Sequence, residues 1–335
     1  MEDEHVQPEQ RLFDVASGWY PEPGAREPKR LIEAAVQCLV DGLDSPSLRI
    51  LAGASSLDEP ATIKELLEAS LTELGIPRPD PSAPWKAVVH QGRVLSRRAA
   101  DRVRFAVQLA DDSVGGHEVL IFVNDVDVTR AGAGMGMEPF DLLIPRNRLV
   151  ATKDPVRVPI ARCDCGVYGC GSTDVTILRD GDVVHWEWAV EKPMGQGVTF
   201  AADEYDVEVA RVAADRRWER PEDTSARLVL EDSDRTHLAS HGLKLDWVAK
   251  DYRNPRLLLV ALSTGNNDYR SAEAGYQIFV RFGRADRTPE AVAAEAVDHL
   301  GLVPSTWQAS WRATKPGVEV PPAMAGADWT WERFP

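Results

Sequence analysis

The sequence has few cysteines, no long apolar run and no excess of positive charge. Only 4 of its 335 residues are cysteine. The longest apolar runs, such as Leu257–Leu262, are far shorter than the roughly 20 residues of a membrane-spanning helix, so we expect no membrane contact. Acidic residues number 53 and basic residues 38, which gives a formal net charge of −15. Because such a surface repels phosphate groups, we expect no nucleic-acid partner.

The composition is typical of a soluble globular protein. Hydrophobic residues make up 44% and charged residues 27% of the chain, which excludes a disordered protein. The first residues, Met1–His5, are acidic and polar, unlike the basic start of a secretory signal. We therefore expect a cytoplasmic protein. Thiols there stay reduced, and clustered cysteines bind metals or react rather than form disulfides.

Three of the four cysteines lie within eight residues, at Cys163, Cys165 and Cys170. Thiols so close in sequence share a small volume, and a soft metal ion or a redox reaction is the usual reason. Neighbouring glycines allow the turns that fold a backbone around an ion. We predict a structural zinc site, which takes four ligands in a tetrahedron. His185, on the second strand of the hairpin that follows, is the candidate fourth ligand.

Other interpretations of the cluster stay open. The thiols could be redox-active, with Cys163 or Cys165 attacking and Cys170 resolving. They could simply be buried, or they could hold a catalytic zinc that keeps one position open. The remaining cysteine, Cys38, lies alone on an apolar helical stripe, and we interpret it as a core residue.

Hydrophobic periodicity predicts an α+β fold. Apolar residues recur at helical spacing after Pro28 and after Pro60, which predicts a helical N-terminal module. Alternating residues predict a hairpin over 103–109 and 119–123, and an Asp-Gly pair predicts another over 174–190, directly after the cysteine loop. In the last third of the chain, the same periodicity predicts an antiparallel layer of strands followed by a closing helix. The expected parts are a flexible arm (1–26), a helical module (27–76), a Pro-rich linker (77–84), a β-rich region with the cysteine loop (85–200) and a C-terminal α+β region (201–335).

Three weaker signals accompany the cluster. His237 and His241 lie four apart in a predicted helix, so both imidazoles share a face, but the glutamate of a zinc protease is missing between them. The glycine-rich stretch 132–137 lacks the Gly-Lys-Ser/Thr ending of a phosphate loop, and we predict a mobile surface loop. Tryptophans pair at 186/188 on a predicted strand and at 307/311 on a predicted helix, for core packing or as a partner surface.

Two parts of the chain resemble a group of uncharacterised actinobacterial proteins that has no assigned activity. They are Ile160–Gly171 together with Asp180–Trp186, and the Leu-Asp-Ser-Pro-Ser-Leu-Arg segment at 43–49. The resemblance implies no catalytic role. It implies that the cysteine loop and the hairpin act as one unit.

The leading hypothesis is a cytoplasmic, non-catalytic protein-interaction protein with a structural zinc. Its acidic, tryptophan-bearing surface would bind a basic protein partner, as an immunity or inhibitor protein does. This hypothesis also depends on the lack of a recognisable Ser-His-Asp arrangement or nucleophile elbow. The alternatives are a metal- or thiol-dependent enzyme that uses the Cys163/Cys165/Cys170 loop, and a thiol redox sensor.

Overall fold

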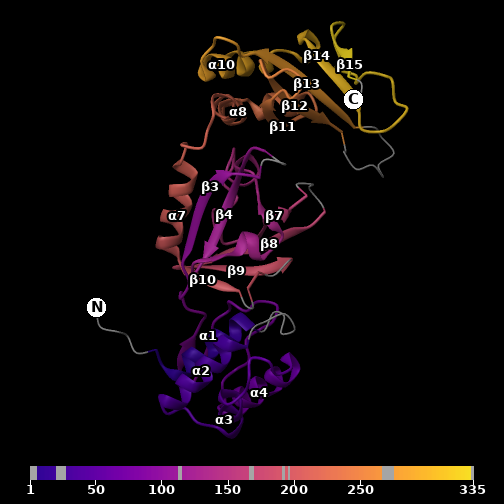
Figure 1. The fold of residues 1–335 in the computed structure, drawn as a ribbon. Coiled ribbons are helices and arrows are strands. Elements are labelled where there is room, and N and C mark those ends of the chain that lie inside the picture. The colour runs from indigo at the N-terminus through magenta and orange to yellow at the C-terminus, as the bar shows by residue number, and fades with distance from the viewer. Residues whose placement is uncertain are drawn as a thin grey trace. The chain divides into compact units, whose positions relative to one another are not determined.

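A computed structural model describes residues 6–19, 28–111, 115–165, 170–190, 193–194, 197–265 and 275–332. The chain forms two compact units (Figure 1). The N-terminal unit comprises residues 1–142 and 147–215, and the C-terminal unit comprises 143–146 and 216–335. The predicted α+β class is confirmed, with N-terminal helices, central antiparallel sheets and a C-terminal sheet with helices. Each helix of the described residues is too short or too polar to cross a membrane.

The N-terminal helices share one apolar core. They are α1 (Pro8–Trp19), α2 (Lys29–Val40), α3 (Pro46–Ala52) and α4 (Pro60–Glu73). The Ser45 side chain begins α3 by accepting a hydrogen bond from the Leu48 amide at 3.2 Å. Cys38 is fully buried in this core, as its position on an apolar stripe predicts.

The prediction that residues 1–26 form a flexible arm is wrong for the part that the structure describes. Residues 8–19 form α1, and Leu12, Phe13 and Trp19 are buried in the helical core. These apolar residues follow helical spacing, but the polar residues between them obscure the pattern in so short a segment. Tertiary packing, which buries one face of the helix, supplies the stability that the isolated segment lacks.

The expected linker, residues 77–84, runs in turns without helix or strand. It leads to a small hairpin of β1 (Val88–His90) and β2 (Arg93–Leu95). Leu95 packs in the helical core, so this hairpin belongs structurally with the helices before it.

Two antiparallel sheets follow. The first has the order β3-β4-β5, from β3 (Val103–Leu109), β4 (His117–Val123) and β5 (Val126–Asp127). The second has the order β10-β9-β8-β7-β6, from β6 (Gly134–Gly136), β7 (Val156–Cys163), β8 (Ser172–Asp180), β9 (Val183–Val190) and β10 (Val198–Ala201). Both predicted hairpins are confirmed, as β3–β4 and β8–β9.

The glycine-rich stretch 132–137 is partly a strand rather than a loop. It contains β6, which pairs with β7, and Met137 pairs with Val119 of β4. A Cβ at Gly136 would clash with the Val119 carbonyl, so glycine permits this close approach of two backbones.

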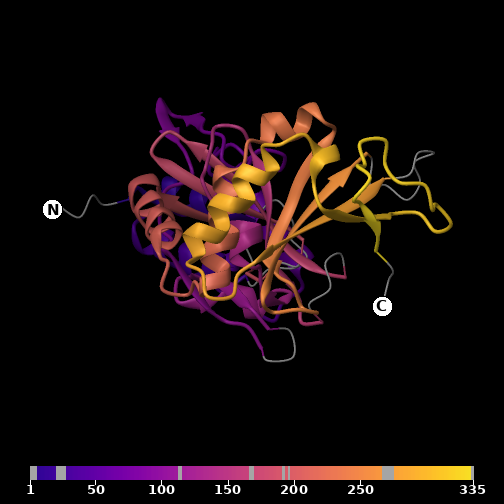
Figure 2. The ribbon, with the colours of Figure 1, turned by 90° about the horizontal axis from the view of Figure 1, so that it is seen from above.

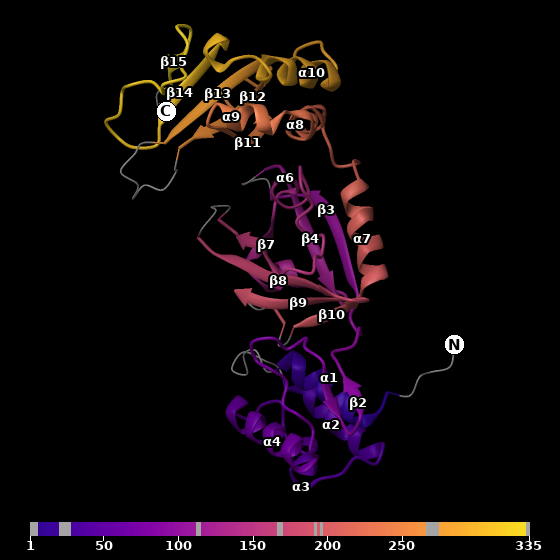
Figure 3. The same ribbon diagram turned by 180° about the vertical axis from the view of Figure 1, so that it is seen from behind.

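Short helices and one long helix complete the N-terminal unit. The short helices are α5 (Val128–Ala131) and α6 (Pro139–Leu142), and the long one is α7 (Ala202–Ala214). Helix α7 lies along β3 (Figure 3). Its Tyr205 accepts a hydrogen bond from the Trp186 indole at 3.2 Å and donates one to the Leu149 carbonyl at 2.6 Å. Because α7 packs in this unit, the C-terminal region begins at residue 216 rather than at 201.

The C-terminal unit is a sheet with helices packed against it. The helices are α8 (Pro221–Asp232), α9 (Arg235–Ser240) and α10 (Pro289–Leu300), with a 3-10 turn at Pro304–Thr306. The sheet has the order β11-β12-β13-β14-β15, from β11 (Leu243–Lys250), β12 (Leu257–Thr264), β13 (Tyr276–Gly283), β14 (Ala309–Ala313) and β15 (Thr330–Trp331). Helices α8 and α10 lie side by side (Figure 2). The prediction of a helix over 307–311 is wrong, because Trp311 lies in β14.

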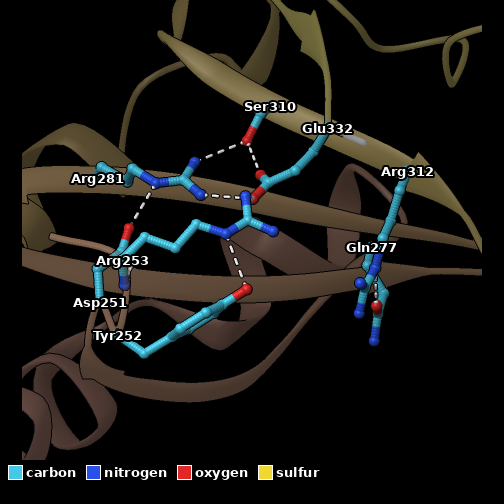
Figure 4. A network of polar contacts seen from close by, with 8 residues as sticks. All are labelled: Asp251, Tyr252, Arg253, Gln277, Arg281, Ser310, Arg312 and Glu332. Carbon is cyan, nitrogen blue, oxygen red and sulfur yellow. Dashed lines mark hydrogen bonds and ion pairs between the residues drawn. The ribbon is translucent and has the colours of Figure 1, made fainter. Parts of the chain in front are cut away.

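A polar network fastens the last strand to this sheet (Figure 4). Arg281 of β13 donates to the Asp251 carboxylate at 2.9 Å, the Ser310 hydroxyl at 2.8 Å and the Glu332 carboxylate at 2.7 Å. Arg253 lies 3.1 Å from the same Glu332 oxygen. Burial opposes ionisation of Glu332, but its hydrogen bonds with Arg281 and Ser310 outweigh burial and lower its pKa. The network therefore holds the residue after β15 in place by charge as well as by strand pairing.

A carboxyl in α1 makes the stability of the N-terminal unit depend on pH. Burial raises the pKa of Asp14 to about 6, although it accepts hydrogen bonds from the Gln10 side chain at 2.6 Å and the Arg98 amide at 3.3 Å. The folded state thus holds this proton more tightly than the unfolded chain, whose aspartates titrate near pH 4, roughly. Stability from this group is present at low pH and falls as pH rises through about 6.

We expect Asp14→Asn to raise the free energy of unfolding by on the order of 1–2 kcal/mol at pH 8 and to change it little at pH 4. Urea denaturation at the two pH values measures this difference. Glu65→Gln, at an exposed position of α4, is the matched control and should have little effect at either pH. A gain of equal size at pH 4 and pH 8 would contradict the assignment.

Candidate metal centre

The hairpin of β7 and β8 positions the cysteine loop. The two strands pair antiparallel, with Arg162 opposite Ser172. The Cys163 amide then donates to the Gly171 carbonyl at 3.0 Å and closes the base of the loop. The loop therefore starts and ends on rigid β-structure, and its cysteines are confined to the end of one hairpin.

The three thiols converge, as their spacing predicts. The Sγ atoms of Cys163, Cys165 and Cys170 all lie within 4.8 Å of one another, and none of them is in a disulfide. A tetrahedral zinc ion with Zn–S bonds of about 2.3 Å places its sulfurs about 3.8 Å apart. Small side-chain rotations are enough to bring the thiols to that separation. The cluster could therefore hold a metal ion.

The two neighbouring cysteines change the ionisation of Cys170. Hydrogen bonds with Cys165 and Cys163, and then their charges, raise the pKa of the Cys170 thiol to about 11. Cys170 therefore keeps its proton at neutral pH, since hydrogen bonds and charge repulsion from its two neighbours oppose a negative sulfur there. A bound cation removes this repulsion and allows coordinating thiols to lose their protons. The arrangement favours metal binding over a thiolate that is reactive by itself.

The neighbouring strand β6 makes room for the loop. Gly134 lies opposite Cys163 in the β6–β7 pairing and has a φ of +103°, where glycine is favoured. A Cβ at this position would clash with the Asp164 carboxylate. The Arg130 side chain donates to the Gly134 carbonyl at 2.5 Å, which holds the strand in this conformation. The glycine-rich stretch thus lets the cysteine loop lie close to β6.

The structure does not bring His185 to the cysteines. In the β8–β9 hairpin His185 lies opposite Leu178, six residues along β8 from Ser172, which is about 20 Å at the rise of a strand. The two-residue turn after Asp180 sets this register. The part of β9 that returns toward the loop is its far end, where Val190 lies opposite Asp174. Counting from the Asp-Gly turn would have shown this from sequence.

His185 is instead a buried, neutral side chain. Its Nδ1 lies 2.9 Å from the Thr199 hydroxyl of β10. Burial, and then the charge of Arg97, lowers the pKa of His185 to about 3. The ring therefore stays uncharged at neutral pH and joins β9 to β10.

His185 and Arg97 also line a cavity of about 980 Å³ that the sequence analysis did not find. The lining comes from three separate segments, 85–99, 179–185 and 201–206. No local motif marks it, because folding brings together residues that are far apart in the chain.

The histidine pair in the C-terminal unit lies at the end of α9. The rings of His237 and His241 are 4.9 Å apart, and His237 Nε2 lies 3.4 Å from the Leu302 carbonyl oxygen. Within the described ranges, these two residues have no third histidine, cysteine or carboxylate close enough to complete a metal group with them. The two histidines therefore lie at the end of a helix and form no such group.

Most tryptophans singled out in the sequence are core residues. Trp186 and Trp188 are 0% and 7% exposed, so they do not form a surface beside the cysteine loop. Trp307, Trp311 and Trp329 are also buried. The expectation of a partner surface made by these residues is therefore corrected. Strand alternation puts Trp186 and Trp188 on the same face, but only the packing of Phe200 and Tyr205 shows that this face is internal.

Comparison of the chain with family models, curated proteins and solved structures finds no match. A function is therefore inferred from the site itself, since a fold alone would not decide it.

Because metal binding requires deprotonated thiols, metal uptake should release protons. We expect zinc binding by the metal-free protein at pH 7 to release about two to three protons per ion, and zinc affinity to fall steeply as the pH is lowered. A pH indicator in weakly buffered solution measures the release. Cys165→Ser is the comparison and should release fewer protons. Stoichiometric zinc binding without proton release would contradict the assignment of these thiols as ligands.

Proposed function

We propose that this protein is a cytoplasmic, non-catalytic interaction protein that binds zinc through Cys163, Cys165 and Cys170. The observation that carries the proposal is the convergence of three thiols, none of them in a disulfide, within 4.8 Å at the end of one hairpin. Thiolates are the ligands that zinc prefers in structural sites, and a reducing compartment keeps them available. Zinc would hold together the loop that β7 and β8 bring to one end of the sheet.

Three thiolates leave one tetrahedral position for another ligand. Cys165 and Cys170 are exposed, so a ligand from outside the chain can reach the ion. We propose that a side chain of a protein partner, an imidazole or a thiolate, takes this position. The net charge of −15 favours a basic partner, both in the rate of encounter and in the choice of partner. An inhibitor or immunity protein would act in this way.

An enzyme is the second candidate, and the same geometry supports it. A catalytic zinc has three protein ligands and keeps its fourth position for water or substrate. A redox sensor is the third candidate, in which Cys163 or Cys165 attacks and Cys170 resolves.

Cobalt(II) in place of zinc reports directly on thiolate ligands. We expect protein loaded with cobalt to show sulfur-to-metal charge-transfer absorption, with one ion per chain. Serine in place of Cys163, Cys165 or Cys170 should weaken binding roughly tenfold or more, since each substitution removes a ligand. Cys38→Ala, in the core of the helical module, is the matched control and should leave the spectrum unchanged.

Purified protein that takes up no metal would rule out this function. Equal cobalt spectra in all four cysteine variants would also rule out the cluster as the binding site.

The open position can be tested with a basic peptide that carries a single histidine. We expect this peptide to shift the ligand-field bands of the cobalt protein, because its imidazole completes the tetrahedron. The same peptide with alanine in place of histidine is the control and should bind more weakly without a shift. An acidic peptide with the histidine should also bind more weakly, given the acidic surface. Insensitivity of the bands to all three peptides would show a closed site and exclude a partner ligand.

A further inference from the structure

The cysteine loop offers three soft ligands, and the described residues add no fourth ligand to the group. Among the described residues, no histidine, further cysteine or carboxylate belongs to the group formed by Cys163, Cys165 and Cys170. His185, the preferred candidate from the sequence, lies along β9 away from the loop. The three cysteines therefore leave the coordination of a four-ligand ion incomplete, whereas they complete the coordination of an ion that takes three ligands.

The three thiols are also reduced and accessible. None is in a disulfide, two of them are exposed, and Cys163 is half-buried at the end of β7. Exposed side chains can change their χ1 rotamers to close around a small centre.

We infer that this loop binds trivalent arsenic or antimony, supplied as the neutral hydroxide, through all three cysteines. The inference rests on the proposed function, since it uses the same thiols as ligands. Trivalent arsenic forms three covalent bonds and keeps a lone pair, so three sulfurs on one side of it complete its coordination. Thiolates are soft ligands and select such soft centres over hard ones. A neutral hydroxide also approaches an acidic protein without the electrostatic cost that an oxyanion would meet.

The step balances without an oxidant or a reductant. As(OH)₃ reacts with three thiols to give As(SR)₃ and three molecules of water. Each As–O bond is replaced by an As–S bond, and each hydroxide leaves with the proton of one thiol. Arsenic stays trivalent throughout. Because the lone pair occupies the fourth corner, the loaded site has no place for a partner side chain, so arsenic would prevent the partner from binding to the loop.

The test compares two probes that need different numbers of thiols. Arsenite uses three thiols for its tightest complex, whereas phenylarsine oxide uses two. We expect wild-type protein to bind one arsenite per chain and to lose three alkylatable thiols on binding, counted by mass spectrometry. Serine in place of any one of Cys163, Cys165 or Cys170 should weaken arsenite binding at least tenfold but leave phenylarsine oxide binding intact. Cys38→Ala should bind both probes like the wild type.

Retained phenylarsine oxide binding also shows that a single-serine variant is folded at the loop, which separates a lost ligand from a lost fold. Protection of fewer than three thiols by arsenite would overturn the inference. Single-serine variants that bind arsenite as tightly as the wild type would do the same. Failure of zinc or cobalt to bind while arsenite binds would exclude the proposed function alone, and the reverse result would exclude this inference alone.

Discussion

The pairing of β7 with β8 is the constraint on which the cysteine cluster depends. It sets Arg162 opposite Ser172, and the hydrogen bond from the Cys163 amide to the Gly171 carbonyl closes the loop. In an unfolded chain, bringing three thiols together costs conformational entropy. The hairpin fixes the loop ends before any ion binds. Folding of the sheet therefore supplies most of this ordering, and an ion at the loop would only have to draw the three thiols together.

The rest of the N-terminal unit keeps this hairpin rigid. Trp186 of β9 packs edge-on against Phe200 and Tyr205, and the Tyr205 hydroxyl ties α7 to the Leu149 carbonyl. These tryptophans thus pack in the core and do not form a surface. Gly134 of β6, which has no side chain, lets the cysteine loop lie close to the neighbouring strand.

Charge and chemistry act together at the loop. The protein carries a net charge of −15, and hydrogen bonds with two neighbouring thiols raise the pKa of Cys170. The charge favours the arrival of a cation, and a centre that binds all three sulfurs has to displace the proton of Cys170. A site with three sulfurs and one open side can then distinguish ions by the number of ligands they require, a property that follows from geometry and needs no catalytic residue.

The sequence by itself determined the features that depend on neighbouring residues. Its periodicity predicts the β3–β4 and β8–β9 hairpins, and the spacing of Cys163, Cys165 and Cys170 predicts that they converge, because residues so close in the chain cannot separate far. Tertiary structure alone decided the helical packing of residues 8–19, the burial of Trp186 and the place of His185. These depend on which distant segment covers a face and on strand register over a whole hairpin, and such long-range packing leaves little trace in the local sequence.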